Sequence, residues 1–476
     1  MRVARFVLSR VVCVTSVTLL ASAIIAVLAL LAATTFTSAQ TANPRDAFGP
    51  DLLSCSPAPC VLGPTQASED GAADAAVVAD PASPKNLMVG SLGSGCYPGA
   101  VGAFLSFDGG SDWIFQCLPS TRYEGALFSP TSGPANGPIV GYDHNGVAYL
   151  GGTYDTHNQK IYFEGFQKSS DGVTWSTPAP ALGRRDYIPY DCWMAVDANA
   201  TSPYVNSVYI SCVMQGKYVN HLLVSHSADG GATWQAAEAG PAQVYPDGDF
   251  NTTMTVGKDG TLYLTWMYCN STPTYCATNP VYILFAKSHD GGNTWSKPSQ
   301  VATVTLHALP NVVVEINNVP AIGADNSNGP RSGNLYVVID NWTGTYLQVE
   351  VVRSIDGGDT WSTPVPVAPG ITHDQFFPWI SVSPDGLVGV SWLDRRNDPA
   401  NVDYQAFAGI SSDGGLTFQP NVQLTTAFSN PALNGQFEMG SFTGNTWDGP
   451  NYFIAAWMDT SNGVETQDVV GGIRLK

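Results

Sequence analysis

A short acidic turn recurs six times along this chain, at intervals of 57 to 66 residues. The third copy reads SADGGATW, from Ser227 to Trp234, and the others repeat its serine, aspartate, glycine and final aromatic in altered form. The aspartates of the six copies are Asp108, Asp171, Asp229, Asp290, Asp356 and Asp413. A constant motif at a period of about sixty residues indicates supersecondary units that stack on one another. The chain is therefore predicted to form one large repeat domain.

Four strand-like segments surround each copy of the turn. Before Asp229 stand CWMAVDA, NSVYISCV and NHLLVSHS, and TWQAAEA follows it. Each segment is short, alternating or fully apolar, and bounded by Gly, Pro or Asn, which is the pattern of β-strands. The acidic turn falls between the third and fourth strands of its unit. Four-stranded units arranged radially form a β-propeller, so the predicted fold class is all-β.

The motif resembles the Asp-box of sialidases and other bacterial neuraminidase-repeat (BNR) proteins, written S-x-D-x-G-x-T-W. The departures are small: Asp112 replaces Thr in the first copy, the second copy is one residue shorter, and Phe418 replaces Trp in the last. The resemblance runs from about Ala72 to the C-terminus and implies a sialidase-like propeller whose boxes have a structural role. We expect each serine and aspartate to bond amides of the turn, and the aromatic to pack within its own blade.

The two ends of the chain decide the number of blades. After the sixth box, three strand-like segments without a box lead to Lys476, and no fourth follows them. Near the N-terminus PCVLGPTQ, from Pro59 to Gln66, belongs to no complete set of strands. Joining it to the last three strands closes a seventh blade, although the sialidases that the boxes resemble have six. The sequence favours seven blades, with residues 40–71 an N-terminal extension that carries the closing strand and 72–476 the propeller.

Residues 1–39 have the pattern of a targeting segment. Arg2, Arg5 and Arg10 precede an apolar run from Val11 to Phe36, and small residues follow up to Ala39, after which cleavage is expected. This is the pattern of a secretory signal peptide. The apolar run is also long enough to span a bilayer as an uncleaved signal anchor. Both readings predict a secreted or otherwise extracytoplasmic protein.

Eight cysteines follow the targeting segment, which agrees with folding in an oxidising compartment. Many pairings of eight cysteines are formally open. Proximity along the chain suggests four local disulfides: Cys55–Cys60, Cys96–Cys117, Cys192–Cys212 and Cys269–Cys276. The CxxC or His-flanked spacing of a structural metal site is absent.

The formal net charge of −19 argues against nucleic acid or an anionic membrane surface as a partner. Contact with a membrane is expected only through an uncleaved N-terminal helix. The expected partner is a carbohydrate or another cell-surface ligand. No cofactor is predicted; a Ca²⁺ site at Asp247 or Asp249 is kept as an alternative to a plain turn.

Propeller topology assigns the loops to two faces. The loops between second and third strands share one face with the connections between blades, and they surround the channel opening. Acidic, aromatic and arginine side chains gather in these loops. This composition suits a sugar ligand, because aromatic rings stack on pyranose faces and an arginine can donate two parallel hydrogen bonds to oxygen atoms. The predicted ligand-binding residues are Arg185, Arg395, Arg396, Tyr187, Trp342 and Trp379. In the alternative reading, Asp and Asn fill turns and Arg395 braces its own loop through Asp394 or Asp398.

The resemblance to sialidases implies a more demanding site for catalysis. Active members grip the sialate carboxylate with three arginines and use an Asp acid/base with a Tyr–Glu nucleophile. The first arginine belongs to a motif ahead of the first box, and residues 79–91 read ADPASPKNLMVGS without it. If the chain hydrolyses glycosides, the predicted acid/base candidates are Asp191, Asp374 and Asp394, with Glu438 as the partner acid and Arg395 as the clamp.

Three functions therefore remain open from the sequence. The favoured one is an exported sialidase-like propeller that recognises a glycan or other extracellular ligand at the channel mouth. The second is an active exo-glycosidase of the sialidase type. The third is a scaffold or assembly subunit held to the membrane by the apolar segment of residues 11–36.

Overall fold

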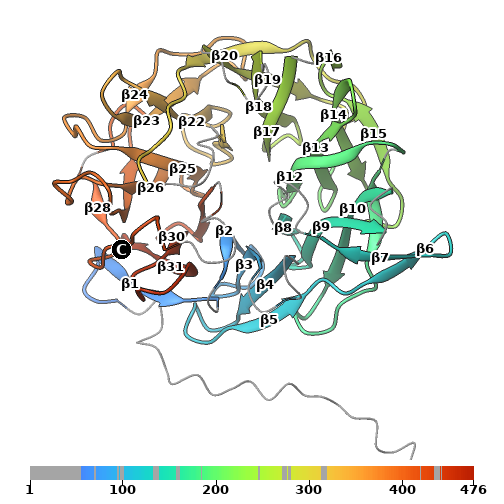
Figure 1. Ribbon diagram of the computed structural model, residues 1–476, viewed down its shortest axis with the longest axis horizontal. Coiled ribbons are helices and arrows are strands. Elements are labelled where there is room, and N and C mark those ends of the chain that lie inside the picture. Colours follow the sequence, from blue (N-terminus) through green and yellow to red (C-terminus); the bar gives the residue numbers. More distant parts are fainter. Residues whose placement is uncertain are drawn as a thin grey trace, which may run out of the picture. The chain divides into compact units, whose positions relative to one another are not determined.

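The computed structural model describes residues 55–476 except 69–70, 94–95, 97–100, 132–138, 157–160, 184, 245–246, 271–275, 277–279, 312–318, 419, 434–439 and 441. The regular elements of this part are all β-strands. Seven antiparallel sheets stand side by side in a ring, the blades of a β-propeller (Figure 1). The predicted all-β fold and the predicted seven blades are both confirmed.

Each blade runs outward from the channel in the order first to fourth strand. Blade 1 contains β2 (Ala73–Ala79), β3 (Leu87–Leu92), β4 (Val101–Ser106) and β5 (Ile114–Cys117). Blade 2 contains β8 (Ile139–Tyr142), β9 (Ala148–Thr156), β10 (Tyr162–Ser169) and β11 (Ala179–Leu182). Blade 3 contains β12 (Ile188–Val196), β13 (Val208–Gln215), β14 (Val219–Ser227) and β15 (Gln235–Glu238). Blade 4 contains β17 (Asp247–Val256), β18 (Leu262–Asn270), β19 (Val281–Ser288) and β20 (Ser299–Val304).

The remaining blades follow the same order. Blade 5 contains β21 (Ile322–Ala324), β22 (Leu335–Trp342), β23 (Leu347–Ser354) and β24 (Val365–Pro366). Blade 6 contains β25 (Gln375–Val382), β26 (Val388–Asp394), β27 (Gln405–Ser411) and β28 (Val422–Gln423). Blade 7 contains β29 (Gly444–Asp448), β30 (Tyr452–Asp459), β31 (Gln467–Arg474) and β1 (Cys60–Gln66). Short extra strands extend blades 2 and 3: β6 (Thr121–Tyr123), β7 (Ala126–Pro130) and β16 (Gln243–Val244).

The N-terminal strand closes the ring. β1 pairs antiparallel with β31, with Cys60 opposite Arg474 and Gln66 opposite Val469. The two strands lie next to each other although they come from opposite ends of the propeller (Figure 1). Leu62 points into the core and has no exposed surface, which explains why an isolated apolar segment precedes the first complete blade. The predicted closing strand is confirmed.

The recurring acidic turns join the third strand to the fourth strand in blades 1 to 6. In blade 3, Ser227 donates its hydroxyl to Asp229 Oδ1 at 2.8 Å. Thr233 donates its backbone N–H and its hydroxyl to the two carboxylate oxygens of Asp229, at 2.8 and 2.7 Å. These hydrogen bonds from Thr233, helped by Ser227, hold the pKa of Asp229 well below its usual range. Gly230 and Gly231 adopt φ angles of 66° and 88°, which L side chains rarely adopt.

The aromatics at the ends of two turns correct one expectation, because their ring partners lie in the preceding blade. Trp234 of blade 3 packs against Phe166 of blade 2, with ring centroids 5.2 Å apart. Trp361 of blade 5 packs in the same way against Phe285 of blade 4, at 5.3 Å. The turns therefore fasten neighbouring blades to each other as well as closing their own hairpins.

Cations strengthen the same inter-blade contact. They come from the residue just before the serine of one turn and donate to a glycine carbonyl of the next turn. The bonds are Lys168 Nζ to Gly230 O at 2.6 Å, Lys287 Nζ to Gly357 O at 3.0 Å, and Arg353 Nη1 to Gly414 O at 3.2 Å. A basic residue at this position thus links consecutive acidic turns.

The eight cysteines form the four disulfides that proximity suggested, Cys55–Cys60, Cys96–Cys117, Cys192–Cys212 and Cys269–Cys276. Disulfides agree with an extracytoplasmic protein. The targeting segment of residues 1–39 lies outside the described residues. Within the described part, no helix is long and apolar enough to cross a membrane.

Candidate functional site

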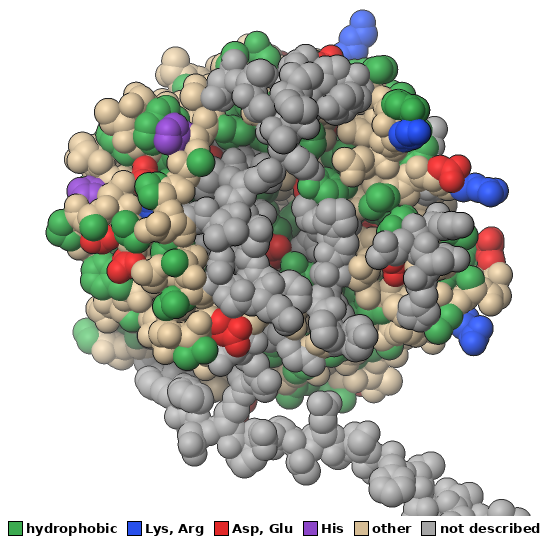
Figure 2. Space-filling view, in the orientation of Figure 1, with side chains coloured by type: hydrophobic (Ala, Val, Ile, Leu, Met, Phe, Trp, Pro, Cys, Tyr) green, Lys and Arg blue, Asp and Glu red, His purple; other side chains and the backbone are tan. Residues whose placement is uncertain are grey.

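The channel mouth is the face on which the first strand of each blade begins and the second strand ends. The starts of β12, β17 and β25 and the ends of β22 and β26 lie on this face. Of the predicted site residues, Asp191, Trp342, Asp374 and Asp394 come from these strand ends. Near the centre of the ring, acidic and hydrophobic side chains are visible, whereas most visible Lys and Arg side chains lie at its outer edge (Figure 2).

Four innermost strands share an irregularity at the mouth. At the same place in β2, β12, β17 and β25 the register shifts and one residue has a positive φ. These residues are Asp74 (59°), Asp191 (50°), Asn251 (54°) and Phe377 (49°). Left-handed backbone is strained for residues other than glycine, and strain of this kind concentrates at functional sites. Bulges also re-aim side chains, so this ring of four residues marks where the channel could hold a ligand.

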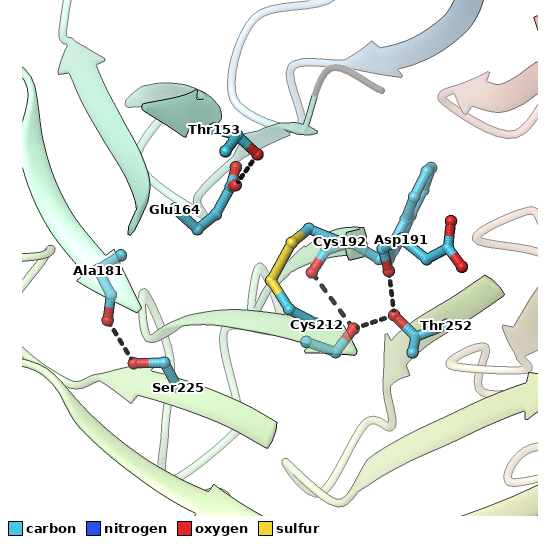
Figure 3. Close-up of a disulfide and its surroundings, with 10 residues drawn as sticks. Thr153, Glu164, Ala181, Asp191, Cys192, Cys212, Ser225 and Thr252 are labelled. Carbon is cyan, nitrogen blue, oxygen red and sulfur yellow. Dashed lines mark hydrogen bonds between the residues drawn. A yellow bond between two sulfur atoms is a disulfide. The ribbon is translucent and has the colours of Figure 1, made fainter. Parts of the chain in front are cut away.

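Asp191 is held in place by the next blade. The backbone N–H of Asn251 donates to Asp191 Oδ2 at 2.8 Å, and the hydroxyl of Thr252 donates to the Asp191 carbonyl at 2.8 Å. Asp191 is partly exposed as a residue. Its carboxylate points away from the Cys192–Cys212 disulfide (Figure 3). Burial raises the pKa of Asp191 to about 7, and the charge of Asp74 raises it further while the Asn251 bond opposes both.

Asp74 is a second carboxylate at this opening, and the sequence analysis missed it. It occupies the position of Asp191 in β2 of blade 1 and is 7 % exposed. Its charge acts on Asp191, and it also acts on the buried Asp468 of blade 7, whose pKa burial raises well above the ordinary value. The available signal was a lone acid within the apolar segment AADAAVVA. The carboxyl groups from blades 1 and 3 are therefore near enough for the charge of Asp74 to raise the pKa of Asp191.

Three aromatic rings meet near these four bulge residues, and two of the rings, Trp193 and Trp379, each stand two positions after one of the four. Trp193 and Trp379 have ring centroids 4.6 Å apart, and Phe442 lies 5.9 Å from each of them. The rings come from blades 3, 6 and 7. Because two blades separate blade 3 from blade 6, Trp193 and Trp379 can meet only across the channel. This aromatic floor includes the predicted ligand residue Trp379, which is 7 % exposed.

Asp374 and Arg395 are paired inside the protein. Arg395 has no exposed surface and donates from Nη1 to Asp374 Oδ2 at 3.4 Å and to the Asn401 carbonyl at 3.1 Å. Its Nη2 donates to the Pro310 carbonyl at 3.0 Å, which ties blade 6 to the segment after blade 4. Asp374 also accepts the backbone N–H of Leu347 at 2.9 Å. In this arrangement neither side chain reaches the solvent, and Arg395 braces its loop through Asp374 instead of Asp394 or Asp398.

Asp394 and Arg396 form a second internal pair. Trp392 Nε1 and Arg396 Nη2 both donate to Asp394 Oδ2, at 2.7 and 2.6 Å. The Arg396 guanidinium lies 4.2 Å from the Phe407 ring centroid. Asp394 is 1 % exposed, so it is directed at its neighbours and away from the opening.

The other predicted ligand residues are Arg185, Tyr187 and Trp342. Arg185 is exposed. Tyr187 packs edge-on against His221, with ring centroids 5.4 Å apart. Trp342 stacks on His307 at 3.7 Å. The structure does not bring these three together with Asp191. The partner acid Glu438 lies outside the described residues.

The predicted Ca²⁺ site at Asp247 or Asp249 is not supported by a cluster of metal-binding side chains in the described part of the chain. Asp249 is fully buried and accepts a hydrogen bond from Trp266 Nε1 at 2.8 Å. Burial raises its pKa to about 7, against the opposing effect of Trp266. Among the described residues, Asp247 and Asp249 belong to no group of three metal-binding side chains. A Ca²⁺ site there stays a prediction.

No family model matches the chain, and no curated protein matches it. Among solved structures, a PL25 ulvan lyase is 11 % identical, with 88 % of this chain and 96 % of that chain covered and a TM-score of 0.52. The microbial sialidase Hz136 is 13 % identical, with 83 % and 75 % covered and a TM-score of 0.45. A protein of unknown function from Dyadobacter fermentans is 16 % identical, with 71 % and 94 % covered and a TM-score of 0.47.

These likenesses concern the fold. The similarity to the ulvan lyase extends over nearly the whole of both chains, so the arrangement of strands is shared. The similar structures include sialidases, arabinofuranosidases and a polysaccharide lyase.

Proposed function

We propose that this chain is an exported propeller that binds a carbohydrate in the channel mouth. The observation that carries the proposal is the convergence of Asp191 and Asp74 above the aromatic floor of Trp193, Trp379 and Phe442. Carboxylates accept hydrogen bonds from sugar hydroxyls, and an apolar ring surface accommodates a sugar face. The bulges that carry the two carboxylates are strained, and strain kept at an opening supports a ligand role.

The proposed ligand is a neutral or amino-bearing sugar. Arg395 and Arg396, the arginines that could have gripped a sugar carboxylate, are bonded to Asp374 and Asp394. Asp191 and Asp74 would repel a carboxylated sugar and attract an ammonium group. This differs from what the resemblance to sialidases implies, because a sialate carries a carboxylate.

Hydrolysis is the second candidate. Two carboxyl groups at one opening are the minimum that glycoside hydrolysis requires, and their separation across the bond sets the outcome. Asp191 and Asp74 replace the expected Asp191–Glu438 pair in this reading. The membrane-scaffold alternative depends on residues 11–36, and no feature of the propeller favours it.

A glycan array and a panel of fluorogenic glycosides test the two candidates on the secreted form. The expected result is binding of neutral or amino-bearing oligosaccharides, with affinity reduced about ten-fold or more in Asp191→Asn, which keeps the side-chain shape but lowers acceptor strength. Release of the fluorophore by the wild type but not by Asp191→Asn would favour hydrolysis. Equal binding by the wild type and Asp191→Asn, or binding of no glycan, would refute the site.

A further inference from the structure

A second polar group lies between blades 2 and 3, outside the mouth site. Glu164, on β10, has no exposed surface. Its Oε2 accepts the hydroxyl hydrogen of Thr153 at 2.8 Å, whereas its Oε1 is buried with no hydrogen-bond partner among the described residues. Leaving a buried oxygen unpaired costs free energy, so its retention in an apolar interface needs an explanation.

A disulfide lies close to the Glu164 carboxylate. Cys192 of β12 and Cys212 of β13 are both buried, and their Cα atoms are 4.2 Å apart. A carboxylate oxygen of Glu164 and the two sulfurs all lie within 4.8 Å of one another. Figure 3 shows Glu164 beside the Cys192–Cys212 pair, with its carboxylate turned toward Thr153. The surrounding side chains are apolar, including Ile139, Met194 and Met214.

We propose that Glu164, Cys192 and Cys212 form a redox-gated site for one divalent cation of the Zn²⁺ class. In the oxidised protein the sulfurs are bonded to each other and the site is closed. When two molecules of an external thiol reduce the disulfide, they form their own disulfide and leave Cys192 and Cys212 as thiols. The cation then displaces the thiol protons, and the carboxyl proton where present, into solvent.

The ligand set suits this cation class. Zn²⁺ takes thiolate sulfur at about 2.3 Å and carboxylate oxygen at about 2.0–2.2 Å in tetrahedral geometry. Three protein ligands would leave one position for water or a fourth donor. Thiolates favour Zn²⁺ and similar soft ions over Ca²⁺ or Mg²⁺. The unpaired oxygen of Glu164 would gain its missing partner only in the metal-bound form.

A redox titration of the full secreted protein tests the proposal. The protein is equilibrated at a series of reduced-to-oxidised glutathione ratios, with and without Zn²⁺, and peptide mapping measures reduction of each of the four disulfides. Zn²⁺ is added at about ten times its dissociation constant. The ratio of reduced to oxidised glutathione at which half of Cys192–Cys212 is reduced should then fall about ten-fold, because the cation binds only the reduced form. The other three disulfides serve as controls in the same molecule.

Two variants locate the third ligand. Glu164→Gln should abolish the Zn²⁺ effect on Cys192–Cys212. Glu350→Gln should leave it intact, because Glu350 is a carboxyl of the third strand of blade 5 that bonds Asn341. An unchanged ratio with Zn²⁺, or an equal effect in Glu164→Gln, would overturn the proposal. Loss of the native tryptophan spectrum on reduction in the presence of Zn²⁺ would overturn it too, because the site requires β10 against β12 and β13.

Discussion

Asp191 and Asp394 are both aspartates at the channel mouth, yet they are available to a ligand to very different extents. Asp394 accepts hydrogen bonds from Trp392 and Arg396 and is 1 % exposed, whereas Asp191 is a partly exposed residue whose carboxylate accepts the backbone N–H of Asn251. Propeller topology predicted the face for both residues. It could not predict burial, which depends on side chains from other strands and blades. For the same reason Arg395 looked like a surface turn residue although it lies in the interior.

Arg395→Lys tests the internal brace. Lysine cannot reproduce the planar contact with Asp374, Asn401 and Pro310, so we expect the free energy of unfolding to fall by about 1–3 kcal/mol. Ligand affinity should stay unchanged. Urea unfolding and titration of the same sample measure both quantities. Arg185→Lys is the control, since Arg185 is exposed. A loss of affinity at unchanged stability would restore the ligand-clamp role predicted from the sequence.

Asp249→Asn tests the buried carboxyls through pH. The raised pKa of Asp249 means that the folded state keeps its proton up to about pH 7, whereas the unfolded chain loses it near about pH 4. The folded state therefore binds more protons between these values, and stability falls as pH rises through this window. Asparagine removes this contribution and still accepts from Trp266.

The measurement is the urea midpoint of the wild type and Asp249→Asn at about pH 4.5 and about pH 7.5. We expect the variant to gain stability relative to the wild type at the higher pH. Glu164, Asp340 and Asp468 have raised pKa values as well, but they contribute equally to both proteins. A difference between the two proteins that does not change with pH would contradict this account.

At the scale of elements, the acidic turn is the feature that the sequence describes best. Its position between third and fourth strands and its hydrogen bonds follow from local chemistry, in which a serine, an aspartate and two glycines close a tight turn. The partners of its aromatic could not be predicted locally. Phe166 and Trp234 are 68 positions apart, and only the packing of blade 2 on blade 3 brings them into contact.

Asp229→Ala should destabilise the protein without affecting the ligand. The change removes the acceptor of the Thr233 N–H and hydroxyl, and we expect a lower melting temperature at unchanged ligand affinity. Because this turn is exposed, the loss should be smaller than that of a buried hydrogen bond. Differential scanning calorimetry measures it, with Asp112→Ala as a control, because Asp112 is an exposed residue of the first turn outside its serine–aspartate pair. An unchanged melting temperature would mean that the turn is not stabilised by its carboxylate.

At the scale of the whole molecule, closure of the ring depends on β1, which completes blade 7 although it comes from the opposite end of the propeller sequence. Three strands without an acidic turn predicted that a fourth was missing, and the only unassigned apolar segment supplied it. This inference required only a count of the predicted strands in each blade, and no knowledge of tertiary contacts. The mouth was harder to predict, because Asp74, Asp191 and the aromatic floor come from blades 1, 3, 6 and 7, which only ring closure brings together.

Leu62→Ala tests the closure. Leu62 is fully buried in β1, so we expect the free energy of unfolding to fall by about 2–5 kcal/mol. Val61→Ala is the matched control on the same strand, since Val61 is 41 % exposed, and its effect should stay within about 0.5 kcal/mol. Equal effects of the two substitutions in urea unfolding would argue that β1 does not close the ring.

The central claim is that ligand contacts belong to the mouth carboxylates and stability belongs to the acidic turns. The most direct measurement determines ligand affinity by calorimetric titration and melting temperature on the same samples of the wild type, Asp191→Asn and Asp229→Ala. The account predicts about a ten-fold or greater loss of affinity at a near-native melting temperature for Asp191→Asn, and a lowered melting temperature with native affinity for Asp229→Ala. The opposite pattern, with affinity lost in Asp229→Ala and kept in Asp191→Asn, would contradict it.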